Sequence, residues 1–284
     1  MDYKKMKSSV RLLIRITRKF INENGKHKIN WVKTIYFNFR TMPFEQARKL
    51  PVYIYGKVKF VNLDGDVIIN GDVKSGMIKL GQNRDLFSAN RRGLILINNA
   101  SQVVFNGPMM AYVGYVIRVT HKARLEFGNY SLIGSNVKIC CSKHIVLGEK
   151  SAVGFESQLI DTNFHYSINE NTNKIGNIYK EIIIGKSNWI GNRVTIMKGT
   201  KTPENTIVAA GSYLNKDYVK DNDKKGLLIV GSPGREIANG YREIVSGKYE
   251  KILNDYFTNN PDADFYIENN WDRDFLYDRA KQFE

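Results

Sequence analysis

Cysteine is almost absent from this sequence: the only two, Cys140 and Cys141, are adjacent in a chain of 284 residues. Neighbouring side chains on a strand point to opposite sides, so we do not expect a disulfide between them. A small secreted scaffold held together by disulfides is thereby excluded, and a reducing compartment is expected.

Long apolar runs are missing as well. No stretch of about 18 apolar residues occurs, and the N-terminus has no hydrophobic region of the signal-peptide type. We therefore expect a cytoplasmic protein, with peripheral contact at the inner face of the cell membrane as an option considered below. With 42% hydrophobic residues the chain is not of the disordered class and can bury a core.

Acidic residues are scarce at one end of the chain. Residues 1–59 hold 15 Lys or Arg against three acidic residues, whereas residues 251–284 hold four basic and eight acidic residues, within a net charge of +15. A basic segment of this kind suits nucleic acid, an anionic membrane surface or an acidic partner. No recognised nucleic-acid-binding motif accompanies the charge, so we expect no nucleic-acid partner.

The basic N-terminal segment, residues 1–50, is predicted to be helical. From Ser9 to Ile21 apolar residues follow helical spacing and basic residues occupy much of the remaining surface. Through residues 1–24 this helix would either lie on an anionic membrane or cap the open end of a repeat structure. The aromatic-rich run Trp31 to Phe39 is expected to pack on the core, and a short helical run is expected between Pro43 and Pro51.

An aliphatic or aromatic residue recurs every six positions in the second half of the chain, in the sets Phe127, Ile133 and Ile139; Leu147, Val153 and Leu159; and Ile184, Ile190 and Ile196. A period of six is typical of a parallel β-helix, and three hexads make a triangular coil of 18 residues. Glycine follows the first and second member of each set, and we expect these glycines to allow positive φ at the corners. Residues 51–126 have the same β-rich character without the clean period and are expected to form irregular coils.

The period is interrupted twice. Ile145 and Val146 are interpreted as a two-residue insertion, and the 25-residue interval from Leu159 to Ile184 is seven longer than a full coil. The second interval holds Asp161 to His165, followed by a polar excursion, and predicts a loop at residues 166–183 that protrudes from the β-helix. Insertions in solenoids gather on the binding face, which makes His165 a candidate catalytic residue.

Three motifs resemble those of the left-handed β-helix hexapeptide-repeat acyltransferases, especially bacterial sugar and polysaccharide O-acetyltransferases. They are the D-x-x-x-H corner at Asp161, the block SNWIGNRVTIMKG from Ser187 and VAAGSYLNKD from Val208; the GSPGR turn at Gly231 is similar to the closing motif of the family. The resemblance covers residues 127–237. It implies a mainly β chain, folded as a left-handed parallel β-helix with α-helical segments at both ends, that forms a homotrimer and binds acetyl-CoA between subunits.

The resemblance also implies roles for particular residues. His165 would be the general base that takes the proton of a sugar hydroxyl, with no acyl-enzyme, while Asp161 or Asn163 would orient the imidazole or hold the acceptor. A backbone N–H near Gly191 would stabilise the oxyanion. The resemblance also implies cofactor contacts by Trp189, Ala209, Ala210, Gly211, Ser212, Lys216 and Arg235. Trp189 would contact the acceptor substrate as well.

Three functions compete on the residues alone. The leading one is an acetyl-CoA-dependent O-acetyltransferase acting on a precursor of a surface polysaccharide or on a glycolipid, with an amino sugar as the alternative acceptor. A catalytically silent trimeric scaffold is the alternative from a different class, because fold alone does not establish activity. A zinc enzyme is disfavoured because the four histidines offer no set of three ligands. The domain prediction is a basic segment 1–50, a β-helix 51–235 with its regular hexads at residues 127–215, and a helical extension 236–284 that caps the β-helix or braces the trimer.

Overall fold

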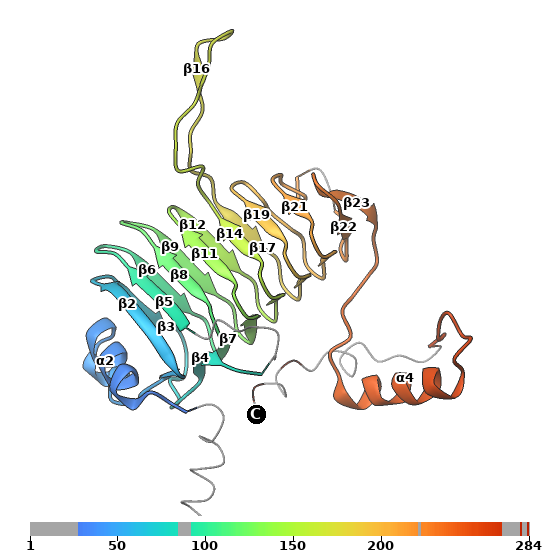
Figure 1. Ribbon diagram of the computed structural model, residues 1–284, viewed down its shortest axis with the longest axis horizontal. Coiled ribbons are helices and arrows are strands. Elements are labelled where there is room, and N and C mark those ends of the chain that lie inside the picture. Colours follow the sequence, from blue (N-terminus) through green and yellow to red (C-terminus); the bar gives the residue numbers. More distant parts are fainter. Residues whose placement is uncertain (1–27, 85–91, 221–222, 269–278, 280–282, 284) are drawn as a thin grey trace, which may run out of the picture.

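The computed structural model describes residues 28–84, 92–220 and 223–268, together with residues 279 and 283. Three parallel sheets form the faces of a prism whose coils stack from left to right in Figure 1, with helical segments at both ends. The predicted mainly β fold, a parallel β-helix, is confirmed. The basic helix predicted at Ser9 to Ile21 lies outside the described residues.

The chain visits the three faces in turn. The first face contains β1 (Val52–Ile54), β4 (Ile78–Gln82), β7 (Met109–Tyr112), β10 (Ser131–Ile133), β13 (Ala152–Val153), β18 (Trp189–Ile190), β20 (Ile207–Val208), β22 (Leu228–Val230) and β23 (Arg235–Ala238). The second face contains β2 (Lys57–Leu63), β5 (Arg92–Ile97), β8 (Val116–Val119), β11 (Lys138–Cys141), β14 (Gln158–Ile160), β19 (Thr195–Met197) and β21 (Tyr213–Leu214). The third face contains β3 (Asp66–Ile69), β6 (Gln102–Phe105), β9 (Arg124–Phe127), β12 (His144–Leu147) and β17 (Ile182–Ile184). We call the turns that follow these faces the first, second and third corners.

The hexad residues form ladders inside the prism. On the second face Ile139 lies opposite Leu159, which lies opposite Ile196, and all three are fully buried. On the third face the rings of Phe105 and Phe127 stack with their centroids 5.2 Å apart. Each ladder residue removes apolar surface from water at roughly 25 cal/mol per Å², so the shaft is the main source of stability.

The third face corrects the interpretation of both register breaks. Ile145 and Leu147 both point inward on β12, in register with β9 and β17, so the predicted two-residue insertion is an ordinary part of a longer strand. Ile160 pairs with Cys140, and Ile182 pairs with Ile145. The long interval therefore adds no coil: it is an insertion confined to the second corner.

The corner glycines are explained by close approach, and the predicted positive φ is wrong. Positive φ falls two residues later, at non-glycine positions such as Lys150 (58°) and Arg193 (56°). A Cβ on Gly148 would lie 2.5 Å from the carbonyl carbon and oxygen of Gly185 in the next coil, and one on Gly191 would lie 2.7 Å from the oxygen of Val208. Successive coils approach so closely at these points that any side chain would collide with backbone.

Helix α2 (Trp31–Thr41) covers the first coil, and α3 (Phe44–Ala47) follows it. The Asn38 amide group donates to the oxygen of Val52 and accepts from its nitrogen, which satisfies the open edge of β1. Among the aromatic residues predicted to pack on the core only Phe37 is buried; Trp31 and Phe39 remain well exposed. The side chains of α2 that are buried against the core are mostly polar. The prediction that its aromatic residues pack on the core is therefore wrong except for Phe37.

At the other end the parallel stack is closed by an antiparallel strand. β23 pairs with β22 in the antiparallel sense, and an extended segment then leads to α4 (Gly247–Asn259), which begins at the N-cap Ser246. The predicted amphipathic helix is therefore present, although Tyr249 is its only buried residue. Further along, Phe283 returns to the prism and packs edge-on against Tyr130.

Candidate active site

The predicted protruding loop is an antiparallel hairpin that projects from the second corner (Figure 1). Its short strands are β15 (Ile168–Asn169) and β16 (Lys174–Ile175), and its base is held by a bridge between Thr162 and Tyr179. We call residues 161–181 the arm. Five large hydrophobic residues of the arm are exposed: Phe164, Tyr166, Ile168, Ile175 and Tyr179.

Asp161 fixes the first root of the arm. The residue is fully buried, and its two carboxylate oxygens accept hydrogen bonds from the amides of Ser142 (2.6 Å), Lys143 (2.7 Å) and His144 (2.9 Å). Burial raises the pKa of this carboxyl, while the three amide hydrogen bonds act in the opposite direction. Its oxygens are occupied by the corner below, so Asp161 does not orient the imidazole of His165 as predicted; its role in this chain is structural.

Glu181 fixes the second root of the arm. Its carboxylate forms an ion pair of 2.7 Å with Lys201 and lies 3.9 Å from Nδ1 of His144. The hydrogen bond from Lys201 lowers the pKa of Glu181. His144 in turn contacts Glu126 at 2.9 Å through Nε2. The first root is thus held by the amides of residues 142–144 and the second by Lys201, contacts that the sequence did not indicate.

His165 is exposed at the base of the arm. The preceding residue, Phe164, has a φ of 61°, which turns the chain outward, and its ring lies 5.9 Å from the guanidinium carbon of Arg118 on β8. The backbone amide of His165 donates to the oxygen of Asn163 at 2.7 Å, which closes this turn. The imidazole is therefore carried by a defined backbone and is accessible to an acceptor from solvent.

A second group of predicted residues gathers at the first corner. The corner at Ala209–Ser212 stacks on Gly191, where an added Cβ would lie 2.8 Å from the backbone nitrogen of Ala210. Ala210 and Gly211 are exposed, and Trp189 on β18 is 44% exposed on the outside of the first face. The surface of the first corner therefore consists of backbone and very small side chains beside one aromatic ring. A long, narrow ligand could lie along such a surface because no side chain blocks it.

Arg235 belongs to this group, whereas Lys216 does not. The turn before Arg235 is attached to the first corner, because the amide of Gly231 donates to Oγ of Ser212 and the amide of Gly234 to the oxygen of Tyr213. Lys216 follows β21 at the second corner and places its Nζ 5.6 Å from the ring of Tyr218. Within the described residues neither cation forms an ion pair with an acidic side chain.

The amides of both glycines at the first corner are used within the stack. The amide of Gly191 donates to the oxygen of Val208 at 2.8 Å, and the amide of Gly211 donates to the oxygen of Asn192. The oxyanion donor predicted near Gly191 would therefore be a different N–H of this corner.

The structure does not bring the two groups together within one chain. His165 follows the second face, whereas Gly191 and the corner at Ala209–Ser212 precede it. A second-face strand such as β14 has three residues, so at about 3.3 Å per residue the two corners are separated by roughly 10 Å or more. A site that uses both groups within one chain would have to span the width of the second face.

In the described part of the chain, no three His, Cys, Asp or Glu side chains cluster in a way that would hold a metal ion. The described helices are also too short and too polar to span a bilayer.

The sequence matches no family model. Similar solved structures include the polysialic acid O-acetyltransferase OatWY (18% identity, covering 72% of this chain and 98% of that one, TM-score 0.42) and the polysialic acid-specific acetyltransferase NeuO (15%, 74% and 99%, 0.40). A hexapeptide-repeat acetyltransferase from Vibrio cholerae in complex with acetyl coenzyme A is 23% identical over 49% of this chain and 70% of that one, with a TM-score of 0.34. Sequence identities below 25% and TM-scores below 0.5 do not support a conclusion about activity.

Proposed function

We propose that the protein is an acetyl-CoA-dependent O-acetyltransferase whose acceptor is a sugar hydroxyl of a polysaccharide precursor or glycolipid. One observation supports this proposal best. The accessible His165 on the anchored arm is separated from the corner at Ala209–Ser212, where the backbone is exposed beside Trp189. Such a division suits a reaction between two substrates that enter from different sides. An amino sugar acceptor would use the same arrangement.

The proposed step is direct transfer. His165 in its neutral form accepts the hydroxyl proton as the acceptor oxygen attacks the acetyl carbonyl. The carbon–sulfur bond then breaks, and the imidazolium returns the proton to the sulfur, so that coenzyme A leaves as the thiol. A sugar hydroxyl is a poor nucleophile at neutral pH, so removal of its proton during attack is needed. We assign contact with the acceptor sugar to Asn163, which is exposed next to the turn.

Cofactor binding is assigned to the first corner. Small residues at Ala209–Ser212 and Gly191 allow a pantetheine chain to approach the backbone, and Trp189 offers an apolar surface beside it. Arg235 is suited to bidentate contact with a phosphate. Lys216 can contribute to the same cofactor only from another subunit or from across the end of the prism.

The two corners would meet in a homotrimer of parallel prisms. In support, a two-stranded hairpin is marginally stable by itself, and the exposed hydrophobic residues of the arm require a surface to cover them. A neighbouring first face supplies such a surface and would complete the site. In this arrangement Asp161 contributes to the site by anchoring the first root of the arm, which carries His165.

Titration calorimetry with coenzyme A tests the cofactor assignment. We expect the wild-type protein to bind, and Ala210→Trp to bind at least about tenfold more weakly because an indole would fill the bare corner. Val219→Trp, a similar change at another exposed position, is expected to bind like wild type. Equal binding by the Ala210 variant would remove the first corner from the site, and no binding by the wild type would favour the silent scaffold.

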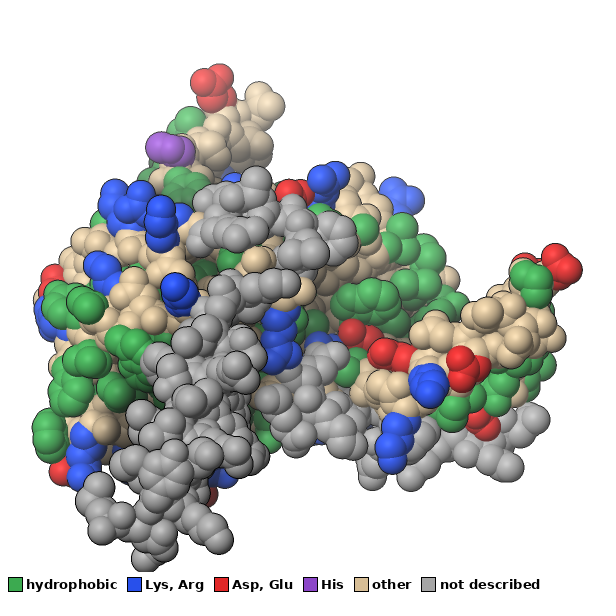
Figure 2. All heavy atoms as spheres, turned by 60° about the horizontal axis from the view of Figure 1, so that its bottom comes forward, with side chains coloured by type: hydrophobic (Ala, Val, Ile, Leu, Met, Phe, Trp, Pro, Cys, Tyr) green, Lys and Arg blue, Asp and Glu red, His purple; other side chains and the backbone are tan. Residues whose placement is uncertain are grey.

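We also propose that the N-terminal end of the prism contacts an anionic membrane, with residues 1–24 contributing. The outer side of α2 exposes Trp31, Val32, Ile35, Tyr36 and Phe39, and Phe44 of α3 continues this surface. Figure 2 shows hydrophobic side chains among Lys and Arg at this end of the molecule. Aromatic residues with nearby basic residues suit the interface of a bilayer, where each basic residue contributes about 1 kcal/mol.

The membrane proposal is tested by liposome sedimentation. Val32→Ser with Phe44→Ser, which are 77% and 65% exposed, should weaken binding to phosphatidylserine liposomes about tenfold, since both side chains lose their transfer into the interface. Ile237→Ser removes an equally exposed residue (63%) at the opposite end and should have no effect. If the double variant and Ile237→Ser bound liposomes equally weakly, or if both bound like wild type, the assignment of this surface to membrane binding would be contradicted.

A further inference from the structure

The second corners of four successive coils each carry a lysine. Lys122 follows β8, Lys143 follows β11, Lys180 lies at the second root of the arm, and Lys198 follows β19. We call these four residues the lysine row. Coils stack at about 4.8 Å, so the row is about 15 Å long and includes the base of the arm. Figure 2 shows Lys and Arg side chains gathered near the base of the arm.

The backbone of the prism fixes the positions of the row. The amide of Arg124, where the first of these corners ends, donates to the oxygen of Lys143 at 3.0 Å, and the amide of Lys180 donates to the oxygen of Asp161 at 3.1 Å. The side chain of Lys198 is half-buried and donates from Nζ to a backbone oxygen of the arm. The other three lysines are exposed, so their ammonium groups are accessible to a ligand.

The lysines of the row lack acidic partners. None of the four forms an ion pair within the described part of the chain. The acidic residues at the roots of the arm are engaged elsewhere, because Asp161 is buried against backbone amides and Glu181 is paired with Lys201. Arg118 on β8, whose guanidinium carbon lies 5.9 Å from an aromatic ring of the arm, is a further cation without an acidic partner among the described residues. The corner that carries His165 therefore has an excess of positive charge.

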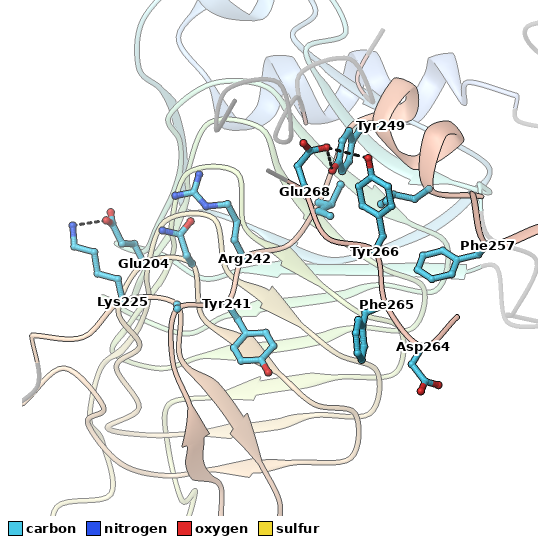
Figure 3. A pocket seen from close by; sticks show the side chains of 15 residues that line it. Glu204, Lys225, Tyr241, Arg242, Tyr249, Phe257, Asp264, Phe265, Tyr266 and Glu268 are labelled. Atoms are coloured by element: carbon cyan, nitrogen blue, oxygen red, sulfur yellow. Dashed lines mark hydrogen bonds and ion pairs between the residues drawn. The ribbon is translucent and has the colours of Figure 1, made fainter. Parts of the chain in front are cut away.

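Cations at the other two corners are paired with glutamates. The described residues form such pairs at the first corner with Arg193–Glu156 (2.7 Å), and at the third corner with Lys186–Glu149 (3.0 Å) and Lys225–Glu204 (2.6 Å). The last pair lies beside a cavity of about 800 Å³ next to α4 (Figure 3). Exposed ion pairs add little stability, but each cancels the charge of its cation. The unpaired lysine row therefore distinguishes the second corner.

A row of unpaired cations at regular spacing is suited to a polymer with regular negative charge. Like charges at this spacing repel each other, and an anionic ligand that lies along them relieves the repulsion. A single phosphate or carboxylate group contacts only part of the row, whereas a linear glycan with a charge on each unit contacts its whole length. We propose that the acceptor is a polyanionic glycan, carrying carboxylate or phosphodiester groups, that lies along the lysine row and passes the imidazole of His165.

This assignment rests on the proposed function, because it names the class of substrate from which His165 takes a proton. Attraction between the row and the polymer increases the rate of encounter. It also holds successive units near the imidazole without a separate pocket for each of them. Nucleic acid is the other common polyanion, but the sequence has no recognised nucleic-acid-binding motif, which favours a glycan.

Three hexameric glycans test the charge of the ligand on the full-length protein. Hexagalacturonic acid carries a carboxylate on each unit, its methyl ester is the neutral counterpart, and a phosphodiester-linked mannose hexamer carries phosphate instead. Binding is measured by calorimetry at low salt. We expect at least one anionic hexamer to bind with a Kd of about 100 μM or tighter, and the methyl ester to bind at least about tenfold more weakly. The anionic hexamer that binds more tightly identifies the charged group.

Paired lysine variants test the place of binding. Lys122→Gln with Lys143→Gln should weaken binding of the anionic hexamer about tenfold, because half of the charges of the row are removed. Lys186→Gln with Lys225→Gln is the matched control, which removes the same charge from exposed lysines at the third corner. Its affinity should stay within about twofold of wild type. Both double variants should unfold at nearly the same temperature as wild type, since exposed charges contribute little to stability.

A polyanionic acceptor is contradicted if the methyl ester binds as tightly as the acid, if neither anionic hexamer binds at about 10 mM, or if the two double variants lose affinity equally. Tighter binding of a single-stranded decathymidylate than of either anionic hexamer would assign the row to nucleic acid instead. His165→Ala should bind the glycan normally. Glycan binding without acetyl transfer by the wild type would refute the proposed function and leave the lysine row as a polyanion site. Acetyl transfer without anionic binding would do the reverse.

Discussion

Replacement of His165 by alanine is expected to lower acetyl transfer by a factor of at least about 100, the usual contribution of a general base. The imidazole is exposed and its backbone is fixed by the turn at Phe164, so the substitution should alter neither the arm nor the fold. Coenzyme A binding should be unchanged, because the first corner carries it. Acetyl transfer is measured by release of the free thiol in the presence of a saccharide acceptor.

His121→Ala is the matched control for this prediction. His121 is also exposed, and its Nδ1 contacts the backbone oxygen of Asn99, at the second corner two coils before the arm. Loss of that contact should leave the transfer rate within about twofold of wild type. An active His165→Ala protein would remove the general base from the mechanism, and equal losses in both variants would point to a structural effect.

Gly148→Ala is expected to destabilise the protein by about 2–3 kcal/mol, a large effect for one added methyl group. The new Cβ would lie 2.5 Å from the backbone of Gly185, and neither coil can retreat without breaking the ladders on both sides. The loss of backbone entropy in the unfolded chain acts in the opposite direction, but by less than about 1 kcal/mol. Urea unfolding followed by circular dichroism measures the difference.

Gly176→Ala provides the comparison. Gly176 lies in the arm, and a Cβ there would meet no atom within 4 Å. Its stability should stay within about 0.5 kcal/mol of wild type. If Gly148→Ala were equally harmless, the coils would be less closely stacked at the corners than described, and the account of the corner glycines would be wrong.

The sequence predicted the coil because its signal is local and periodic. The sets that contain Ile139, Leu159 and Ile196 point inward at every repeat, and the structure stacks them as expected. What a period cannot show is which residues lie opposite each other. Ile145 and Leu147 form one strand of the third face, and this became visible only through their pairing with β9 and β17.

The sequence suggested candidate residues one at a time, but not how they lie relative to one another. His165 was singled out because it follows Asp161 at the start of the break in the period. The role of Asp161 was misjudged. Its carboxylate accepts hydrogen bonds from three backbone amides that belong to a corner 17 to 19 residues earlier in the sequence. Likewise a cavity beside α4 joins Glu204 and Lys225 of the third corner to residues between 15 and 64 positions later, and no local pattern reports such contacts.

The separation of the two corners leads to the most direct test of the proposed mechanism. His165→Ala and Ala210→Trp would each impair a different half of the site, and at acetyl-CoA concentrations well below those that saturate the Ala210 variant both homo-oligomers should have low activity. When the two proteins are unfolded and refolded together in equal amounts, random assembly places an intact arm beside an intact first corner at about a quarter of the interfaces. We predict recovery of about a quarter of the wild-type transfer rate. A mixture that stays as inactive as its components would contradict a site shared between neighbouring chains.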